Sequence, residues 1–239
     1  MDKSLTPADK FSSALKEHAP RYDVQLSMGN IDRLREYYEH VMAWNPRQHL
    51  VAPCSPAEFA TRHVLESLLA VSHIPDGALV VDIGSGAGLP IIPCMIVRPD
   101  LRATLIESSP KKAVFLREVS RRVGAHDRAA IIADRFENLP APAAEFVTCR
   151  ALERFVETFP KLVEWSPPKS TLLLFGGNSL RKKIDDARLI YQIVPIPQSE
   201  RRFLFVIRRR ESRSAENMKS FRGGPPSATG EVPPTSGGR

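Results

Sequence analysis

Apolar residues recur at intervals of three and four through the first 75 residues, which is the spacing of helices that bury one face. Thr6-Pro7-Ala8-Asp9 has the residue types of a helix start, and a second helix is expected from about Asn30 to near Pro46. Ser55-Pro56-Ala57-Glu58 is a capping box that opens a third helix. Because no strand pattern interrupts these segments, residues 1–75 are predicted to form a helical region.

After residue 75 the pattern changes to short apolar runs that alternate with helical segments. This alternation predicts an α/β, Rossmann-like fold with a doubly wound, mostly parallel sheet, and the last two runs are expected to close it as a strand pair. The expected strands are 78–83, 103–107, 129–133, 145–148, 171–175, 190–195 and 203–208, and the expected helices are 90–97, 111–123 (capped by Gly124) and 153–165.

The last part of the chain differs from the rest in composition. Residues 211–239 are rich in Ser, Pro, Gly and Arg and contain few apolar residues to bury, so they are expected to form a disordered basic tail. The sequence thus divides into the helical region 1–75, an α/β domain over 76–210 and this tail.

Charge and cysteine content indicate the kind of partner and the cellular compartment. A net charge of +7 and a pI near 9.5 favour polyanionic partners such as nucleic acid. Cys54, Cys94 and Cys149 lack metal-ligand spacing, so no metal is expected, and their odd number suits a reduced cytoplasmic protein. The N-terminus does not resemble a signal peptide, and the most apolar stretch, 78–97, contains Asp82 and several glycines and prolines, which argues against a membrane helix.

The most informative local motif is Val81-Asp82-Ile83-Gly84-Ser85-Gly86-Ala87-Gly88, between the first strand and its helix. Glycines at this point allow the backbone to turn sharply and to approach a ligand. A dinucleotide fingerprint would place its third glycine at Leu89, whereas the observed G-x-G-x-G after an acid suits S-adenosylmethionine, which has no pyrophosphate. A nicotinamide cofactor, or a turn without a ligand, remains an alternative.

An acidic residue is also expected at the end of the second strand, to accept hydrogen bonds from ribose hydroxyls. Glu107 occupies this position. Either cofactor class could use Glu107, and a solvated strand end is the structural alternative. Glu107 is therefore stronger evidence for the predicted sheet than for either cofactor.

Several ordered segments together resemble the ribosomal RNA small subunit methyltransferase G family, over roughly residues 33–208. The glycine loop alone is common to many methyltransferases, whereas the ordered set is far more specific. The matching segments are Trp44-Asn45 with Leu50, 62–68, 82–90, 98–100, 104–108, 111–117, Arg150-Ala151 and 200–202.

The resemblance implies a class of enzyme that methylates a guanine of small-subunit ribosomal RNA with S-adenosylmethionine. Its cofactor positions correspond to Gly84, Leu89, Phe136, Glu137 and Arg150, and the loop adds Asp82, Gly86, Gly88 and Glu107. Phe136 can flank an adenine, although a core aromatic is the alternative, as an ion pair is for Arg150.

The basic positions near this cleft are expected to contact RNA, since Lys and Arg reach phosphates. For His63 the alternative is a structural histidine, and for Lys111 and Lys112 a solvated helix start. The expected set is Arg62, His63, Lys111, Lys112, Arg117, Arg201 and Arg202. Small-subunit RNA or the small subunit itself is the expected partner, with no membrane, and the chain is expected to act as a monomer.

Three positions depart from the family's pattern. Ile91 replaces a glycine after the loop proline, His49-Leu50-Val51 replaces Asn-Leu-Thr, and Phe175 replaces a lysine. The last two changes fall on expected RNA-facing edges, so they bear on efficiency or substrate more than on cofactor binding.

Guanine N7 carries a free lone pair, so its methylation requires no general base, and no catalytic acid or base is expected. Arg150 has a possible orienting role. Consistent with this, the residues after the fourth strand, Thr148-Cys149-Arg150-Ala151, lack the acid- or Asn-Pro-Pro-aromatic motif of amino-group methylases. Three alternatives stay open: cytosine-5 methylation with Cys149 as nucleophile, a small-molecule methyltransferase, and a nonenzymatic RNA-binding protein.

Overall fold

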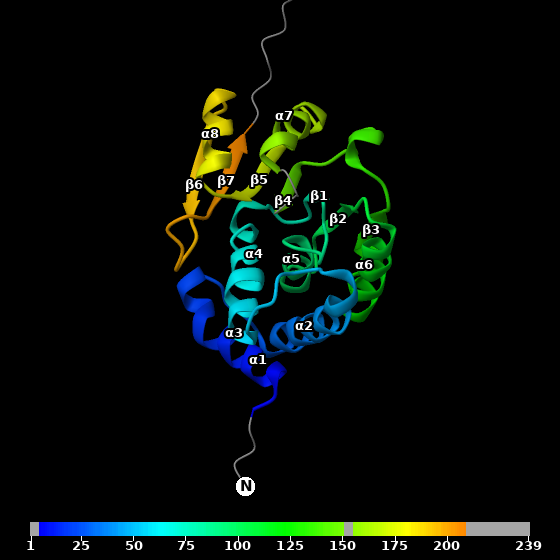
Figure 1. The fold of residues 1–239 in the computed structure, drawn as a ribbon, viewed down its shortest axis with the longest axis vertical. Helices are drawn as coiled ribbons and strands as arrows, with labels where there is room; N and C mark the ends of the chain where they lie inside the picture. Colours follow the sequence, from blue (N-terminus) through cyan, green and yellow to red (C-terminus); the bar gives the residue numbers. More distant parts are fainter. Residues whose placement is uncertain (1–4, 151–154, 209–239) are drawn as a thin grey trace, which may run out of the picture.

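The computed structural model describes residues 5–150 and 155–208, so the expected tail over 211–239 and the start of the expected helix 153–165 lie outside the described residues. A seven-stranded sheet has the order β3-β2-β1-β4-β5-β7-β6 and is parallel except for β7, which runs antiparallel to both neighbours (Figure 1). The α/β class and the closing strand pair are therefore confirmed. The strands are β1 (Leu79–Ile83), β2 (Arg102–Ile106), β3 (Ala129–Ile132), β4 (Phe146–Arg150), β5 (Thr171–Gly176), β6 (Tyr191–Pro195) and β7 (Phe203–Arg208).

The register of the central strands sets where a ligand can bind. Ile83 at the end of β1 pairs with Ile106 at the end of β2 and with Cys149 near the end of β4. Parallel strands end at the same edge, so the glycine loop, Glu107 and Arg150 all emerge at one edge of the sheet, where open α/β folds bind ligands.

Alternate residues of the strands face two separate apolar layers. Val80 and Leu105 belong to a cluster that includes the N-terminal helices, whereas Val81 and Ile106 belong to a second cluster on the other face. Helices α5 (Ile91–Val97) and α6 (Pro110–Arg122) cover the first face, and α7 (Phe155–Trp165) and α8 (Asn178–Asp186) cover the second. The sheet is thus buried on both sides, as parallel sheets require.

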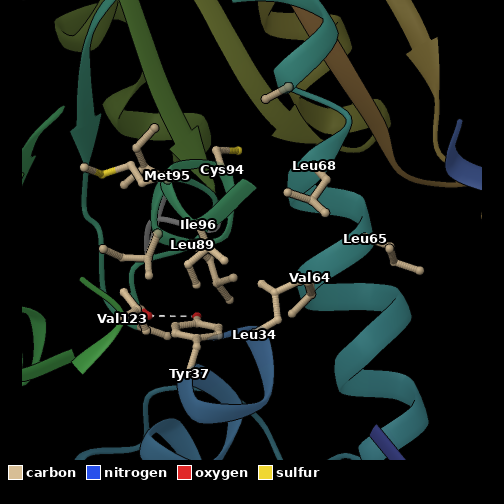
Figure 2. Packing of buried hydrophobic residues seen from close by; sticks show 14 of the residues in the cluster. Leu34, Tyr37, Val64, Leu65, Leu68, Leu89, Cys94, Met95, Ile96 and Val123 are labelled. Carbon is tan, nitrogen blue, oxygen red and sulfur yellow. Dashed lines mark hydrogen bonds between the residues drawn. The ribbon is translucent and has the colours of Figure 1, made fainter. Parts of the chain in front are cut away.

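The N-terminal helices pack on α5 and α6 rather than standing apart from the sheet (Figure 1). Helix α1 (Pro7–His18) begins at the expected N-cap, Thr6, which also forms a capping box with Asp9. Helix α2 (Met28–Gln48) carries Tyr37, which is fully buried and donates a hydrogen bond from its hydroxyl to the carbonyl of Ala87 at 2.9 Å (Figure 2). This contact joins the helical region directly to the glycine loop.

Helix α2 ends later than the sequence predicted. It passes through Pro46 and stops at His49, whose φ of +47° breaks the helix. The helix ends two residues beyond the expected end near Pro46, because this proline lies in the last turn, where a distortion that it causes affects few residues of the helix.

The third N-terminal helix contains an irregular middle. The capping box of Ser55 and Glu58 opens α3 (Pro56–Glu58), as expected, and the chain then continues through a π-helical segment, Phe59–Leu65, into α4 (Glu66–Leu68). π-helical turns widen a helix locally and are frequent at functional sites. Here the wide segment carries Arg62 and His63.

The sequence prediction did not include α8. Only Leu180 and Ile184 of this helix are buried, and its first residue follows Gly177 without a side-chain cap. These two apolar residues lie one turn apart, which is a helical spacing that sequence reasoning overlooked in a mostly polar segment. Among the described helices, none combines the length and apolar character that a bilayer crossing requires.

Candidate active site

The glycine loop turns through conformations that L side chains rarely adopt. Gly84, Gly86 and Gly88 have φ angles of +67°, +52° and +84°. Gly88 also allows close packing, since a Cβ there would lie 2.5 Å from Cγ1 of the buried Ile92 on α5. The loop therefore requires glycine at all three positions for its backbone shape, and at Gly88 also for its close contact with α5.

Glu107 holds the loop from the end of β2. Its buried carboxylate accepts hydrogen bonds from the backbone N–H of Gly86 and of Ser109, both at 2.8 Å. One side chain thus connects the loop after β1 to the start of α6. A carboxylate oxygen can accept more than one hydrogen bond, so Glu107 retains acceptor capacity toward a ribose.

Asp82 lies beneath the loop, not at its surface. It is fully buried, and its Oδ1 accepts a hydrogen bond from the Thr148 hydroxyl at 2.7 Å. Burial raises the pKa of Asp82 to about 7, against the lowering effect of hydrogen bonds from Ser85 and Thr148. Asp82 lines neither of the cavities described below, so its contribution to a cofactor site is to the shape of the loop.

A first cavity of about 530 Å³ lies on the β2–β3 side of the loop. Phe136 and Glu137, two of the expected cofactor positions, both line it. The Phe136 ring packs edge-on against Trp165, with centroids 5.4 Å apart. The aromatic packing fixes the ring at the cavity wall, where a flat heterocycle can lie against it.

A second cavity of about 860 Å³ lies on the other side of the loop and is lined by both apolar and charged side chains. Gly84 and Ser108 line both cavities, so the two are neighbours across the loop. The second cavity brings together residues that are far apart in the sequence. They include Leu50, Val51, Arg62, His63, Gly86, Leu89, Glu107, Lys112, Arg150, Phe175 and Arg202.

The expected RNA-binding residues separate into two groups. Arg62, His63, Lys112 and Arg202 line the second cavity, whereas Lys111, Arg117 and Arg201 line neither cavity. Arg117 donates instead to the Ile131 carbonyl at 3.4 Å. The structure therefore gathers four of the seven at one opening.

His63 is unsuited to bind phosphate as a cation. Its ring lies 5.1 Å from that of Phe59, and burial, followed by the charges of Arg150 and Arg62, lowers its pKa to about 3. The imidazole is neutral at physiological pH, so any contact that it makes with RNA is a neutral hydrogen bond or a stacking contact.

Arg150 points toward the π-helical segment and α4. Its guanidinium donates to the carbonyls of Arg62 and His63, to the Ser67 hydroxyl at 3.1 Å and to Glu66 at 3.1 Å. The side chain is only 11% exposed. Arg150 therefore joins the end of β4 to the π-helical segment at the cavity wall, which fits an orienting role.

Two of the departures from the family's pattern lie in the second cavity. Val51 lines it, and Phe175 places its ring 5.6 Å from the Arg150 guanidinium in a cation–π contact. The third, Ile91, is fully buried at the start of α5. The cavity wall of this chain is thus less polar than the family's pattern at Val51 and Phe175.

The structure does not favour Cys149 as a nucleophile. Its side chain is fully buried in the apolar layer shared with α7 and lines neither cavity. Within residues 5–150 and 155–208, no three His, Cys, Asp or Glu side chains are grouped as a metal site would require.

Two residues of the site were missed by sequence reasoning. Glu66 is 2% exposed and accepts from both Arg150 and Arg202, and Tyr37 supports the loop at Ala87. Glu66 had one available signal, because an acid follows the apolar residues Val64 and Leu65 on the buried side of this helix. Tyr37 had no signal beyond its place in an amphipathic helix.

Two solved structures that share this fold are described as methyltransferases. An O-methyltransferase from Bacillus cereus in complex with SAH has a TM-score of 0.56 and 16% identity, covering 84% of this chain and all of that one. An RNA methyltransferase from Salinibacter ruber in complex with S-adenosyl-L-homocysteine has a TM-score of 0.51 and 17% identity, covering 69% and 97%. The strand order and the loop thus define the Rossmann-like fold of S-adenosylmethionine-dependent methyltransferases.

Sequence comparison specifies the family. A model of the family described as rRNA small subunit methyltransferase G matches residues 30–202, so the chain belongs to this family. The ribosomal RNA small subunit methyltransferase G of Sorangium cellulosum (strain So ce56) is 34% identical over 190 residues, 77% of each chain. That of Xanthomonas campestris pv. campestris (strain B100) is 42% identical over 152 residues, 63% of this chain and 71% of the relative.

The residues at the loop fit the cofactor of this fold, S-adenosylmethionine. Glu107 offers carboxylate oxygens beside the loop, and Phe136 offers an apolar face in the first cavity. The loop lacks the spacing of a pyrophosphate site, and Gly86 presents its backbone at the second cavity. An adenosine on the Phe136 side and a methionine reaching across the loop would use both cavities.

Proposed function

We propose that this chain transfers the methyl group of S-adenosylmethionine to N7 of a guanine in small-subunit ribosomal RNA. The observation that carries the proposal is the pair of cavities on the two sides of the glycine loop, in a chain of this family. One side has the groups that suit an adenosine. The other opens toward Arg62, Lys112 and Arg202, which suit an RNA backbone.

The chemistry requires little of the protein beyond placement. S-adenosylmethionine supplies a methyl group on a sulfonium, and guanine N7 has a lone pair with no proton to remove. Of the two carboxylates at the second cavity, Glu66 is paired with Arg150 and Arg202, and Glu107 accepts two backbone N–H groups, which suits a reaction without a general base. The catalytic effect would come from holding the two reactants in line and excluding water.

A flipped base is the form in which RNA would enter. The second cavity is lined by Leu50, Val51, Leu89 and Phe175 on its apolar part. Apolar walls suit an unstacked base, and the nearby cations suit its flanking phosphates. We further propose that the chain acts as a monomer in the cytoplasm, where ribosomal subunits are its substrate.

A small-molecule methyltransferase is the second candidate, since the O-methyltransferase neighbour shares the fold over 84% of this chain. Fold alone does not choose the substrate. The net charge of +7 and the cations at the second cavity favour RNA.

The test is transfer of labelled methyl from S-adenosylmethionine to bare small-subunit RNA, intact small subunits and assembled ribosomes, followed by nucleoside analysis. We expect label as 7-methylguanosine in at least one RNA substrate, at one position. Label in 5-methylcytidine, or none in any RNA while the protein binds the cofactor, would refute the proposal.

A further inference from the structure

The second cavity contains one buried carboxylate that holds two arginines from distant segments. Glu66 is 2% exposed. Its Oε2 accepts from Arg150 Nη2 and from Arg202 Nη1, each at 3.1 Å, and its Oε1 lies 2.8 Å from Arg202 Nη2. One side chain thus joins α4, the end of β4 and the segment between β6 and β7.

The two arginines differ in what remains free for a ligand. Arg150 is 11% exposed and also donates to the carbonyls of the π-helical segment and to the Ser67 hydroxyl of α4. Arg202 is 33% exposed, and its Nε donates to the Ser199 hydroxyl at 3.2 Å. Arg202 is therefore the partly open member of the cluster, and both ends of its guanidinium are fixed by protein contacts.

The backbone beside Arg202 is also held close to the site. A Cβ on Gly177, at the start of α8, would lie 2.8 Å from the carbonyl oxygen of Arg201. The turn after β5 and the β6–β7 segment approach each other at this point because Gly177 has no side chain. The position of Arg202 over Glu66 is thus built from both main-chain and side-chain contacts.

We infer that Glu66 is a positioning residue for RNA, which holds the Arg202 guanidinium at the edge of the second cavity for a phosphate of the target strand. This inference rests on the proposed function. A guanidinium that is already fixed loses less conformational entropy when it binds a phosphate. The carboxylate also screens the two arginines from each other, so that both can lie at one wall of the cavity.

The test is steady-state kinetics of Glu66→Gln with the RNA substrate that the wild type methylates. Glutamine keeps the shape but removes the charge. We expect the KM for RNA to rise about tenfold, as for loss of a charge-assisted contact, with the calorimetric Kd for S-adenosylhomocysteine within about twofold of wild type. Glu58→Gln is the matched control: its pair with Arg62 is on the same helix, both side chains are about half exposed, and glutamine preserves the capping box, so the RNA KM should change less than about twofold.

Arg202→Gln, alone and combined with Glu66→Gln, completes a double-mutant cycle. If Glu66 acts through Arg202, Arg202→Gln alone raises the RNA KM, and adding Glu66→Gln to it causes no further rise. The inference is overturned if Glu66→Gln raises the KM equally in both backgrounds, leaves it unchanged, or weakens cofactor binding as much as RNA. Should Glu66→Gln fail to fold, an unchanged RNA KM in Arg202→Gln overturns it, and a raised one supports it. Absence of RNA methylation by the wild type would instead refute the proposed function.

Discussion

The two sides of the glycine loop are built differently. The first cavity lies at the ends of β1 and β2, beside Phe136 after β3, and α7 closes it with Thr158 and Lys161. The second is lined by segments from Leu50 to Arg202, and its charged groups are ion-paired across them. The difference indicates that backbone geometry at strand ends determines the cofactor site, whereas side chains of the surrounding elements determine the target site.

The largest effect should come from crowding the loop itself. In Gly88→Ala the new Cβ would meet Ile92 at 2.5 Å and would sit at a φ of +84°, so the loop or α5 must move. We expect the calorimetric affinity for S-adenosylhomocysteine to fall at least about 100-fold.

Gly124→Ala is the matched control for this change. Gly124 has a φ of +70°, but nothing lies within 4 Å of its Cβ position. This variant should lose about 1 kcal/mol of stability and no cofactor affinity. Equal losses of affinity in the two variants would show that the close contact with α5 is unimportant.

A smaller effect is expected at the carboxylate that holds the loop. Each oxygen of Glu107 accepts one N–H group, from Gly86 or from Ser109. In Glu107→Gln the side-chain oxygen can accept only one of them, and the amide NH₂ faces the second N–H group. Cofactor affinity should fall about 50-fold, measured by calorimetry, and the RNA KM should rise much less, although Glu107 also lines the second cavity.

Glu145→Gln provides the comparison, since Glu145 accepts from the Leu79 N–H at 3.0 Å at the opposite end of β1. Its substitution should leave the affinity within about twofold, because exposed contacts contribute little. If Glu107→Gln raised the RNA KM as much as the cofactor Kd, the two sides of the loop would not be separable.

Asp82, under the loop, should make stability depend on pH. The unfolded chain ionises an aspartate near pH 4, whereas burial raises the pKa of Asp82 to about 7 in the folded protein. The stabilisation that the protonated Asp82 gives to the folded protein is therefore complete below pH 4 and is lost as the pH rises to 7. Relative to Asp82→Asn, which keeps an acceptor for Thr148, the free energy of unfolding of the wild type should fall by about 2 kcal/mol between pH 5 and pH 8. Denaturant titrations that give the same difference at both pH values would contradict this.

The smallest effect is expected from the support of the loop by α2. Tyr37→Phe removes the hydrogen bond to the Ala87 carbonyl and should weaken cofactor binding about fivefold. Tyr22→Phe is matched, because the Tyr22 hydroxyl contacts Pro197 at 3.4 Å, away from the loop. It should leave cofactor affinity unchanged, and equal effects of the two substitutions would argue against a specific role for Tyr37.

The elements that the sequence predicted correctly have local causes. The strands are apolar runs bounded by turn residues, Ser55 with Glu58 forms its capping box within four residues, and Gly124 ends α6 with a φ of +70°. The glycine spacing identified the loop without tertiary information. The same was true of Glu107, whose position follows from the end of a strand.

The features that were missed depend on contacts between distant segments. Helix α8 is stabilised through Leu180 and Ile184, which belong to the apolar layer on the second face of the sheet. Glu66 acquires its role only when Arg150 and Arg202 meet it, 84 and 136 residues away in the chain. Local periodicity carries no information on such pairings, so the sequence did not indicate the role of Glu66.

Fluorescence offers the most direct test of the assignment of the first cavity to the adenosine. Trp165 packs against Phe136 at this cavity, whereas Trp44 lies against Phe115 in the N-terminal layer. In Trp44→Phe, where Trp165 is the remaining tryptophan, titration with S-adenosylhomocysteine should produce a saturable change in emission. A flat titration at concentrations that saturate binding by calorimetry would contradict the placement of the cofactor.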